Sequence, residues 1–142
     1  MVISSPSSSR VLVMRSPWDY FERVDEFRRW LDARIARGVL MCNSWEILDW
    51  NFDKSYLQDL ARKGVELVPT ICIARGEKAD SAALARARGW DDIVIKPTIG
   101  GGGYRLCRCR VDELPRHADE IARTLEDRGA LVQPFLPEIA NG

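Results

Sequence analysis

A lysine followed by a run of glycines is the stretch of this chain whose residue types could do chemistry. Lys96 closes an apolar, β-branched run at residues 93–95, and the glycines begin four residues later. Glycine tolerates positive φ and presents bare backbone N–H groups, so such a loop can fold around phosphate oxygens. A nearby lysine adds a point charge, and each charge-assisted hydrogen bond contributes about 1.5–3 kcal/mol. The run consists of Gly100, Gly101, Gly102 and Gly103.

The secondary structure expected around these glycines distinguishes between the known kinds of glycine-rich phosphate-binding loop. A Walker loop places its lysine after the glycines and opens a helix, whereas Lys96 comes before them and a strand-like run follows. A dinucleotide-binding fingerprint also opens a helix, and its third glycine position holds Arg105 here. The remaining arrangement is a β-hairpin with a glycine tip. It predicts a lid over phosphate or, alternatively, a loose hairpin beside a solvated lysine.

Hydrophobic periodicity predicts an α/β chain around this hairpin. The first two strands and the helix between them form a strand–helix–strand unit. Asn43 and Glu46 resemble a capping box that opens a short turn at 45–50, and Asp53 is the expected N-cap of the next helix. Strands are expected at 11–14, 39–41, 65–68, 93–95, 104–111 and 130–133, a further short apolar run at 70–74, and helices from about 20 to 37 and at 54–63, 81–88 and 115–127.

Composition and charge argue against several classes of protein. The 142 residues carry 21 Lys plus Arg and 21 Asp plus Glu, so no basic excess attracts nucleic acid. The basic stripe of Arg105, Arg108 and Arg110 could meet phosphate, but a solvated strand face is the ordinary alternative. The chain contains no apolar run of about 18 residues and no secretory signal at its start, so no membrane partner is expected. We expect a cytoplasmic protein.

The four cysteines are expected to be reduced, buried thiols. Cys107 and Cys109 lie two residues apart and suggest a metal site. A zinc site would need a second ligand pair at comparable spacing, and the single histidine, His117, is expected on a solvated helix face. The sequence therefore predicts no metal site. The other two cysteines are Cys42 and Cys72.

Several blocks of sequence, taken in order, resemble the ATP-grasp superfamily, in the branch of glutathione synthetase and RimK-type ligases. Residues 15–21, RSPWDYF, narrow the resemblance to bacterial ATP-grasp proteins that include the cyclo-ligase of cycloserine biosynthesis. The resemblance extends from about Val11 to the end of the chain. The blocks are NFDK at 51–54, GVELVPT at 64–70, VIKP at 94–97, the glycine loop, and QPFLPEI at 133–139.

This resemblance implies a partial ATP-grasp fold of the α/β (α+β) class. A strand–helix–strand central unit is followed by the small ATP-grasp lobe, whose lid is the glycine-rich β-hairpin. The implied parts are a disordered lead at 1–10, a remnant of the central domain at 11–69, the small lobe at 70–133, and the adenine linker with the start of a second lobe at 134–142.

The resemblance also implies an ATP site between two lobes. Lys54, at the start of a helix, and Lys96, at the end of a strand, match the family's phosphate-binding lysines, and the glycine loop closes over the phosphates. The position of Lys54 just inside an N-cap agrees with this role, because a helix N-terminus favours anions. Backbone groups of the linker, expected to be unpaired beside its prolines, would bind adenine. The linker residues are Gln133, Pro134, Phe135 and Leu136.

The family's remaining functional residues have no counterpart in this sequence. Its ribose-binding acid, its Mg²⁺ ligands and a basic residue at the transferring phosphoryl group all follow the position of Gly142. The implied reaction is an EC class 6 ligation, in which ATP phosphorylates a carboxylate and an amine displaces the phosphate. We therefore assign no catalytic or metal residue and expect ATP binding with little ligation by this chain alone. The alternative is a non-catalytic binding module, either a degenerate remnant or half of a split ligase, with self-association or a complementing half as its partner.

Overall fold

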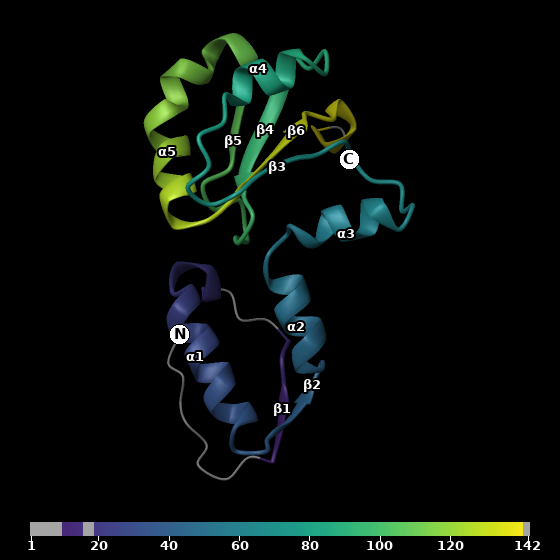
Figure 1. Cartoon of the computed structure of the whole chain (residues 1–142), viewed down its shortest axis with the longest axis vertical. Helices are drawn as coiled ribbons and strands as arrows, with labels where there is room; N and C mark the ends of the chain where they lie inside the picture. The colour runs from purple at the N-terminus through teal and green to yellow at the C-terminus, as the bar shows by residue number, and fades with distance from the viewer. Residues whose placement is uncertain (1–9, 16–18, 141–142) are drawn as a thin grey trace. The chain divides into compact units, whose positions relative to one another are not determined.

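The computed structural model describes residues 10–15 and 19–140. The chain divides after Asp53 into two compact units (Figure 1). Both contain helices and strands, which confirms the α/β class. Residues 1–9 of the expected lead, the central part of the RSPWDYF block, and the last two residues lie outside the described residues. The four-part division expected from the family stays a prediction.

The first unit contains the expected strand–helix–strand arrangement. β1 (Val11–Val13) pairs in parallel with β2 (Leu40–Cys42). A 3₁₀ turn at Tyr20–Glu22 precedes α1 (Val24–Ile35). The strand pair leaves apolar side chains exposed to solvent, and Val13 is 66% exposed. The first strand is therefore mostly exposed within this unit.

The helix α1 supplies the buried residues of this unit. Phe27 and Leu31 lie four positions apart on one helix face and are 5% and 1% exposed. The ring of Phe27 stacks on Phe52 with 5.9 Å between centroids. Phe52 ends α2 (Trp45–Phe52), a full helix where the sequence predicted a short turn. Ser44 takes the N-cap position of α2, so the predicted cap at Asn43 is wrong.

The second unit is built on a four-stranded antiparallel sheet with the strand order β3-β6-β4-β5. The central strands β6 and β4 pair from Ile93 opposite Pro134 to Pro97 opposite Ala130. The strands are β3 (Ile71–Ile73), β4 (Asp92–Pro97), β5 (Cys107–Arg110) and β6 (Ala130–Pro134).

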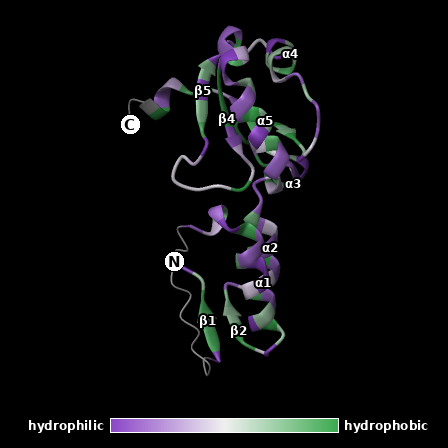
Figure 2. Ribbon diagram, turned by 90° about the vertical axis from the view of Figure 1, so that its left-hand side faces the viewer, coloured by the Kyte–Doolittle hydropathy of each residue, from purple (hydrophilic) through white to green (hydrophobic). Residues whose placement is uncertain are grey.

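Helical segments cover one face of this sheet and close the core of the unit. These are α4 (Ser81–Arg86), a 3₁₀ segment at Val111–His117 and α5 (Ala118–Asp127), which flank the strands in Figure 1. The strands carry hydrophobic residues, which are green in Figure 2, and the buried ones pack with residues of the helical segments in one core. The core residues are Ile71, Ile73, Ala85, Ile93, Ile95, Cys107, Cys109, Val111, Leu114, Ala130 and Val132.

Two local predictions in the second unit are wrong. The helix α3 (Tyr56–Arg62) has Ser55 at its N-cap position, whereas Asp53 is the C-cap that follows α2. Lys54 therefore precedes the helix, and the argument from a helix N-terminus no longer applies to it. Residues 65–68 form no strand, because β6 pairs instead with Ile71–Ile73. None of the helices in the described ranges is long and apolar enough to span a membrane.

Candidate functional site

The glycine loop connects two paired strands, as the sequence predicted. β4 and β5 are antiparallel, and Ile95 lies opposite Cys107 at the base of the hairpin. Gly102 and Gly103 have φ values of 56° and 79°, a region that side chains rarely adopt. The carbonyl of Gly101 accepts a hydrogen bond from the amide of Tyr104 at 3.0 Å. The tip is therefore a folded turn whose curvature requires glycine.

Lys54 holds the entry to this loop. Its backbone amide donates to the carbonyl of Thr98 at 2.9 Å, and its Nζ donates to the carbonyl of Gly100 at 2.5 Å. The lysine thus reaches the glycine run across 46 positions of sequence. A phosphate bound here would accept a hydrogen bond from the Lys54 ammonium, either together with the Gly100 carbonyl or in its place.

A second contact to the loop comes from the turn after α5, which the sequence did not predict. The Arg128 guanidinium donates to the carbonyl of Ile99 at 3.0 Å, and the amide of Thr98 donates to the carbonyl of Gly129 at 2.9 Å. A Cβ on Gly129 would lie 2.8 Å from the carbonyl oxygen of Ile73, so this glycine allows a close backbone approach. From the sequence, Gly129 was expected only to end the preceding helix. The contact itself has no local sequence signal.

Lys96 lies on the sheet face opposite the core. β4 alternates, with Ile93, Ile95 and Pro97 buried and Lys96 on the other side, half-buried. Burial lowers the pKa of the Lys96 ammonium, because the charged form loses water there. An anion beside it would restore the lost stabilisation.

The expected adenine segment begins inside the sheet. Gln133 and Pro134 end β6, and the side-chain amide of Gln133 donates to Oγ1 of Thr70 at 2.7 Å. The amide of Phe135 donates to the carbonyl of Asp92 at 2.9 Å. The expectation of an unpaired backbone is thus wrong for the Phe135 amide, because the sheet pairing continues to this residue.

The basic stripe is compensated by carboxylates. Arg108 binds both carboxylate oxygens of Asp92, at 2.7 and 3.3 Å, and lies 3.3 Å from the centroid of the Phe135 ring. The hydrogen bond from Arg108 lowers the pKa of Asp92. Arg105 pairs with Asp127 at 2.9 Å. Arg108 lies on the exposed face of β5 and Arg105 in the turn before it, and both are held in ion pairs, in line with a solvated face.

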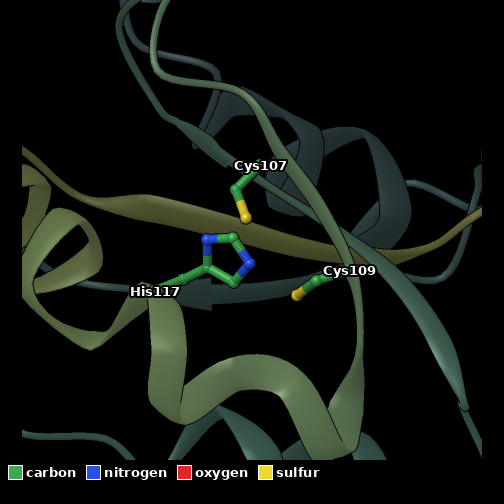
Figure 3. Close-up of side chains that lie close together, drawn as sticks. All are labelled: Cys107, Cys109 and His117. Atoms are coloured by element: carbon green, nitrogen blue, oxygen red, sulfur yellow. The ribbon is translucent and has the colours of Figure 1, made fainter.

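The cysteines and the single histidine are arranged differently from the prediction. Cys107 and Cys109 are buried free thiols, whereas Cys42 is exposed, so its predicted burial is wrong. His117 is half-buried rather than solvated, and its ring lies between the two thiols (Figure 3). Burial, together with the neighbouring Cys107, raises the pKa of Cys109 to about 12. The sequence did not predict this cluster, because two cysteines without a second ligand pair are a weak zinc signal.

The comparisons with known proteins agree with the fold. The family model for the N-terminal domain of D-cycloserine synthetase DcsG matches residues 5–43. The cycloserine biosynthesis protein DcsG of Streptomyces lavendulae is 31% identical over 140 residues, which cover 94% of this chain and 46% of that protein. The crystal structure of D-cycloserine synthetase DcsG matches with a TM-score of 0.85 and 28% identity, over 98% of this chain and 48% of that one. This chain is an ATP-grasp homologue.

Two further proteins are similar to this chain. The tetrahydromethanopterin:alpha-L-glutamate ligase of Methanosarcina acetivorans is 35% identical over 114 residues, 71% of this chain and 33% of that protein. The biotin carboxylase domain of the Hydrogenobacter thermophilus 2-oxoglutarate carboxylase, solved with MgADP, shares the fold with a TM-score of 0.68 at 17% identity, over 89% of this chain and 28% of that one. The chain spans about half the length of DcsG and a third of the glutamate ligase.

Proposed function

We propose that this chain forms the ATP-binding portion of an ATP-dependent carboxylate–amine ligase that acts through an acyl phosphate. The observation that carries the proposal is the hairpin itself. The entry to its glycine loop is held by Lys54, and its first strand presents the half-buried Lys96. The homologues of the chain are ATP-dependent ligases, which supports ATP as the anion.

The phosphates of ATP would bind to Lys96, Lys54 and the glycine loop. Lys96 supplies a charge whose desolvation an anion would offset, and Lys54 already touches the carbonyl of Gly100. Loop amides at the glycine positions would complete the contacts to the phosphate oxygens. The adenine is assigned to residues 133–136. The Phe135 amide is committed to Asp92, so the half-buried Pro134 and Leu136 supply a surface for the ring.

The described residues do not fit Mg²⁺. Among them, the one group of three or more candidate metal ligands is Cys107, Cys109 and His117, a thiol and imidazole set. Mg²⁺ prefers oxygen ligands. We therefore derive no ligation step from this chain and propose that it does not ligate alone. A complementing ligase half would supply the metal ligands and the binding sites for both substrates. Because the proposed reaction consumes ATP, we propose a cytoplasmic location for the complex.

The alternative function is a non-catalytic module that binds nucleotide or another protein. The missing oxygen-ligand cluster among the described residues favours it, since the family's phosphoryl transfer depends on Mg²⁺. The two functions differ in one observable. A complementing half restores ATP-dependent ligation in the first case and has no effect in the second.

A thermal melt with and without millimolar MgATP tests nucleotide binding. A ligand that binds only the folded state stabilises it, by about 2.7 kcal/mol at a concentration of 100 Kd. We expect the midpoint to rise with MgATP and the rise to disappear in Lys96→Met. The exposed Lys78 provides the matched control, and Lys78→Met should keep the full rise. If MgATP still raised the melting midpoint of Lys96→Met, the assignment of Lys96 to the ATP site would be wrong. A cooperative melt that ignores MgATP would overturn ATP binding.

A further inference from the structure

The edge strand of the sheet places two thiols side by side. Cys107 and Cys109 alternate with exposed arginines along β5, so both side chains lie on the core face. They are 8% and 6% exposed. Their strand partners on β4 are Ile95 and Ile93, so the thiols lie on the sheet face opposite Lys96. The pair is therefore separate from the proposed nucleotide site.

The chain's single histidine converges on the same point. His117 ends the 3₁₀ segment that follows β5, eight positions after Cys109. The ligand atoms of Cys107, Cys109 and His117 all lie within 4.8 Å of one another, and Figure 3 shows the imidazole ring between the two sulfurs.

We propose that Cys107, Cys109 and His117 bind a thiophilic divalent cation of the Zn²⁺ type. A tetrahedral ion with Zn–S bonds of about 2.3 Å and Zn–N bonds of about 2.1 Å has ligand atoms roughly 3.5–3.8 Å apart. Separations within 4.8 Å need only small side-chain adjustments to reach that geometry. Two thiols and an imidazole are also the ligands that select zinc over Mg²⁺ or Ca²⁺.

The burial of the three residues fits a site with one open coordination position. Both thiols are buried, whereas His117 is half-buried, so the histidine side gives the ion a path from solvent and a place for a water ligand. The ion would join β5 to the start of α5, which follows His117 directly. β5 is an edge strand with a sheet neighbour on one side only, so a metal bridge would stabilise the returning strand of the hairpin.

Titration of the chain with Co²⁺ and Zn²⁺ tests this site. We expect Co²⁺ to give thiolate-to-metal charge-transfer absorption and tetrahedral visible bands, saturating at one equivalent, and Zn²⁺ to displace it. The midpoint of the thermal melt should rise with Zn²⁺ and return with chelator. Cys107→Ser and His117→Gln should each weaken Co²⁺ binding by more than about 100-fold, beyond the ~10–100-fold that loss of an outer-shell partner causes.

The other two cysteines provide matched controls. Cys72→Ser and Cys42→Ser remove a thiol outside the cluster and should leave the Co²⁺ spectrum and affinity unchanged. His117→Gln changes a half-buried residue, so it separates metal loss from unfolding if Cys107→Ser fails to fold. An absorption spectrum without thiolate bands would overturn the proposal. So would full affinity in His117→Gln, or bands that disappear in Cys72→Ser.

Discussion

The two units of this chain bury their apolar residues to different extents. The second unit closes a core between four strands and three helical segments, with Ile93 and Val132 fully buried. The first unit buries Phe27 and Leu31 on a helix, while Val11 and Val13 on its strand remain 50% and 66% exposed. An apolar strand in the sequence therefore does not ensure a buried strand in the unit that contains it.

The largest expected effect comes from truncating the core of the second unit. Ile93→Ala removes a side chain that is 0% exposed and should lower the free energy of unfolding by about 2–5 kcal/mol. The matched change in the first unit, Val13→Ala at an exposed site, should stay within about 0.5 kcal/mol. Urea denaturation followed by circular dichroism measures both. Equal losses in the two variants would contradict the difference between the units.

A glycine comparison tests backbone packing in the two units. Gly129→Ala places a Cβ 2.8 Å from the carbonyl oxygen of Ile73 and should cost about 1–3 kcal/mol through overpacking. Gly38, after α1, has φ of 71°, and a Cβ added there would meet no atom within 4 Å. Gly38→Ala should therefore cost only the conformational strain of about 1–2 kcal/mol. Denaturation midpoints give the difference. Shortening the Thr98 side chain in Thr98→Ser should recover part of the Gly129→Ala loss, since Cγ2 of Thr98 is also close.

A smaller effect, with a defined pH dependence, is expected at Lys96. Burial lowers the pKa of Lys96 in the folded state below its ordinary value of 10.5, so the unfolded state holds this proton more tightly. The stability of the wild type therefore gains from this group as pH rises through the folded pKa toward 10.5. The Lys96→Met variant should melt no lower than the wild type at pH 7. Its stability should not show the increase at alkaline pH that Lys96 gives the wild type. Melting curves across the alkaline range measure it, and a lower midpoint for Lys96→Met at pH 7 would contradict the desolvation argument.

The smallest effect is expected for the exposed ion pairs. The hydrogen bond from Arg108 holds the folded pKa of Asp92 below its ordinary value of 3.8. Its contribution to stability is present above pH 3.8 and is lost as pH falls through the folded pKa. At neutral pH and low salt, Asp92→Asn should lower the midpoint of the thermal melt slightly. At strongly acidic pH, or at high salt, the midpoint should not change. The single contact of Arg28 with Asp49 at 3.4 Å in the first unit should contribute less, so Asp49→Asn is the control.

Local patterns carried most of what the sequence predicted correctly. The expected burial of Cys107 and Cys109 is confirmed, and consecutive glycines identified the hairpin tip. Capping was predicted less well, because Ser44 and Ser55 stand close to the chosen Asn43 and Asp53 and compete for the same position. A strand at 65–68 was predicted from composition alone, and pairing with β6 selected Ile71–Ile73 instead.

The sequence by itself determined the lysine and glycine hairpin and the ATP-grasp resemblance, because both depend on neighbouring residues and their order. The tertiary structure decided which distant groups meet. Nothing local indicates that Lys54 bonds to Gly100, that Arg128 bonds to Ile99, or that His117 lies between two cysteines. These contacts depend on how the sheet and its helices pack, and the packing is set by the core as a whole rather than by any one segment.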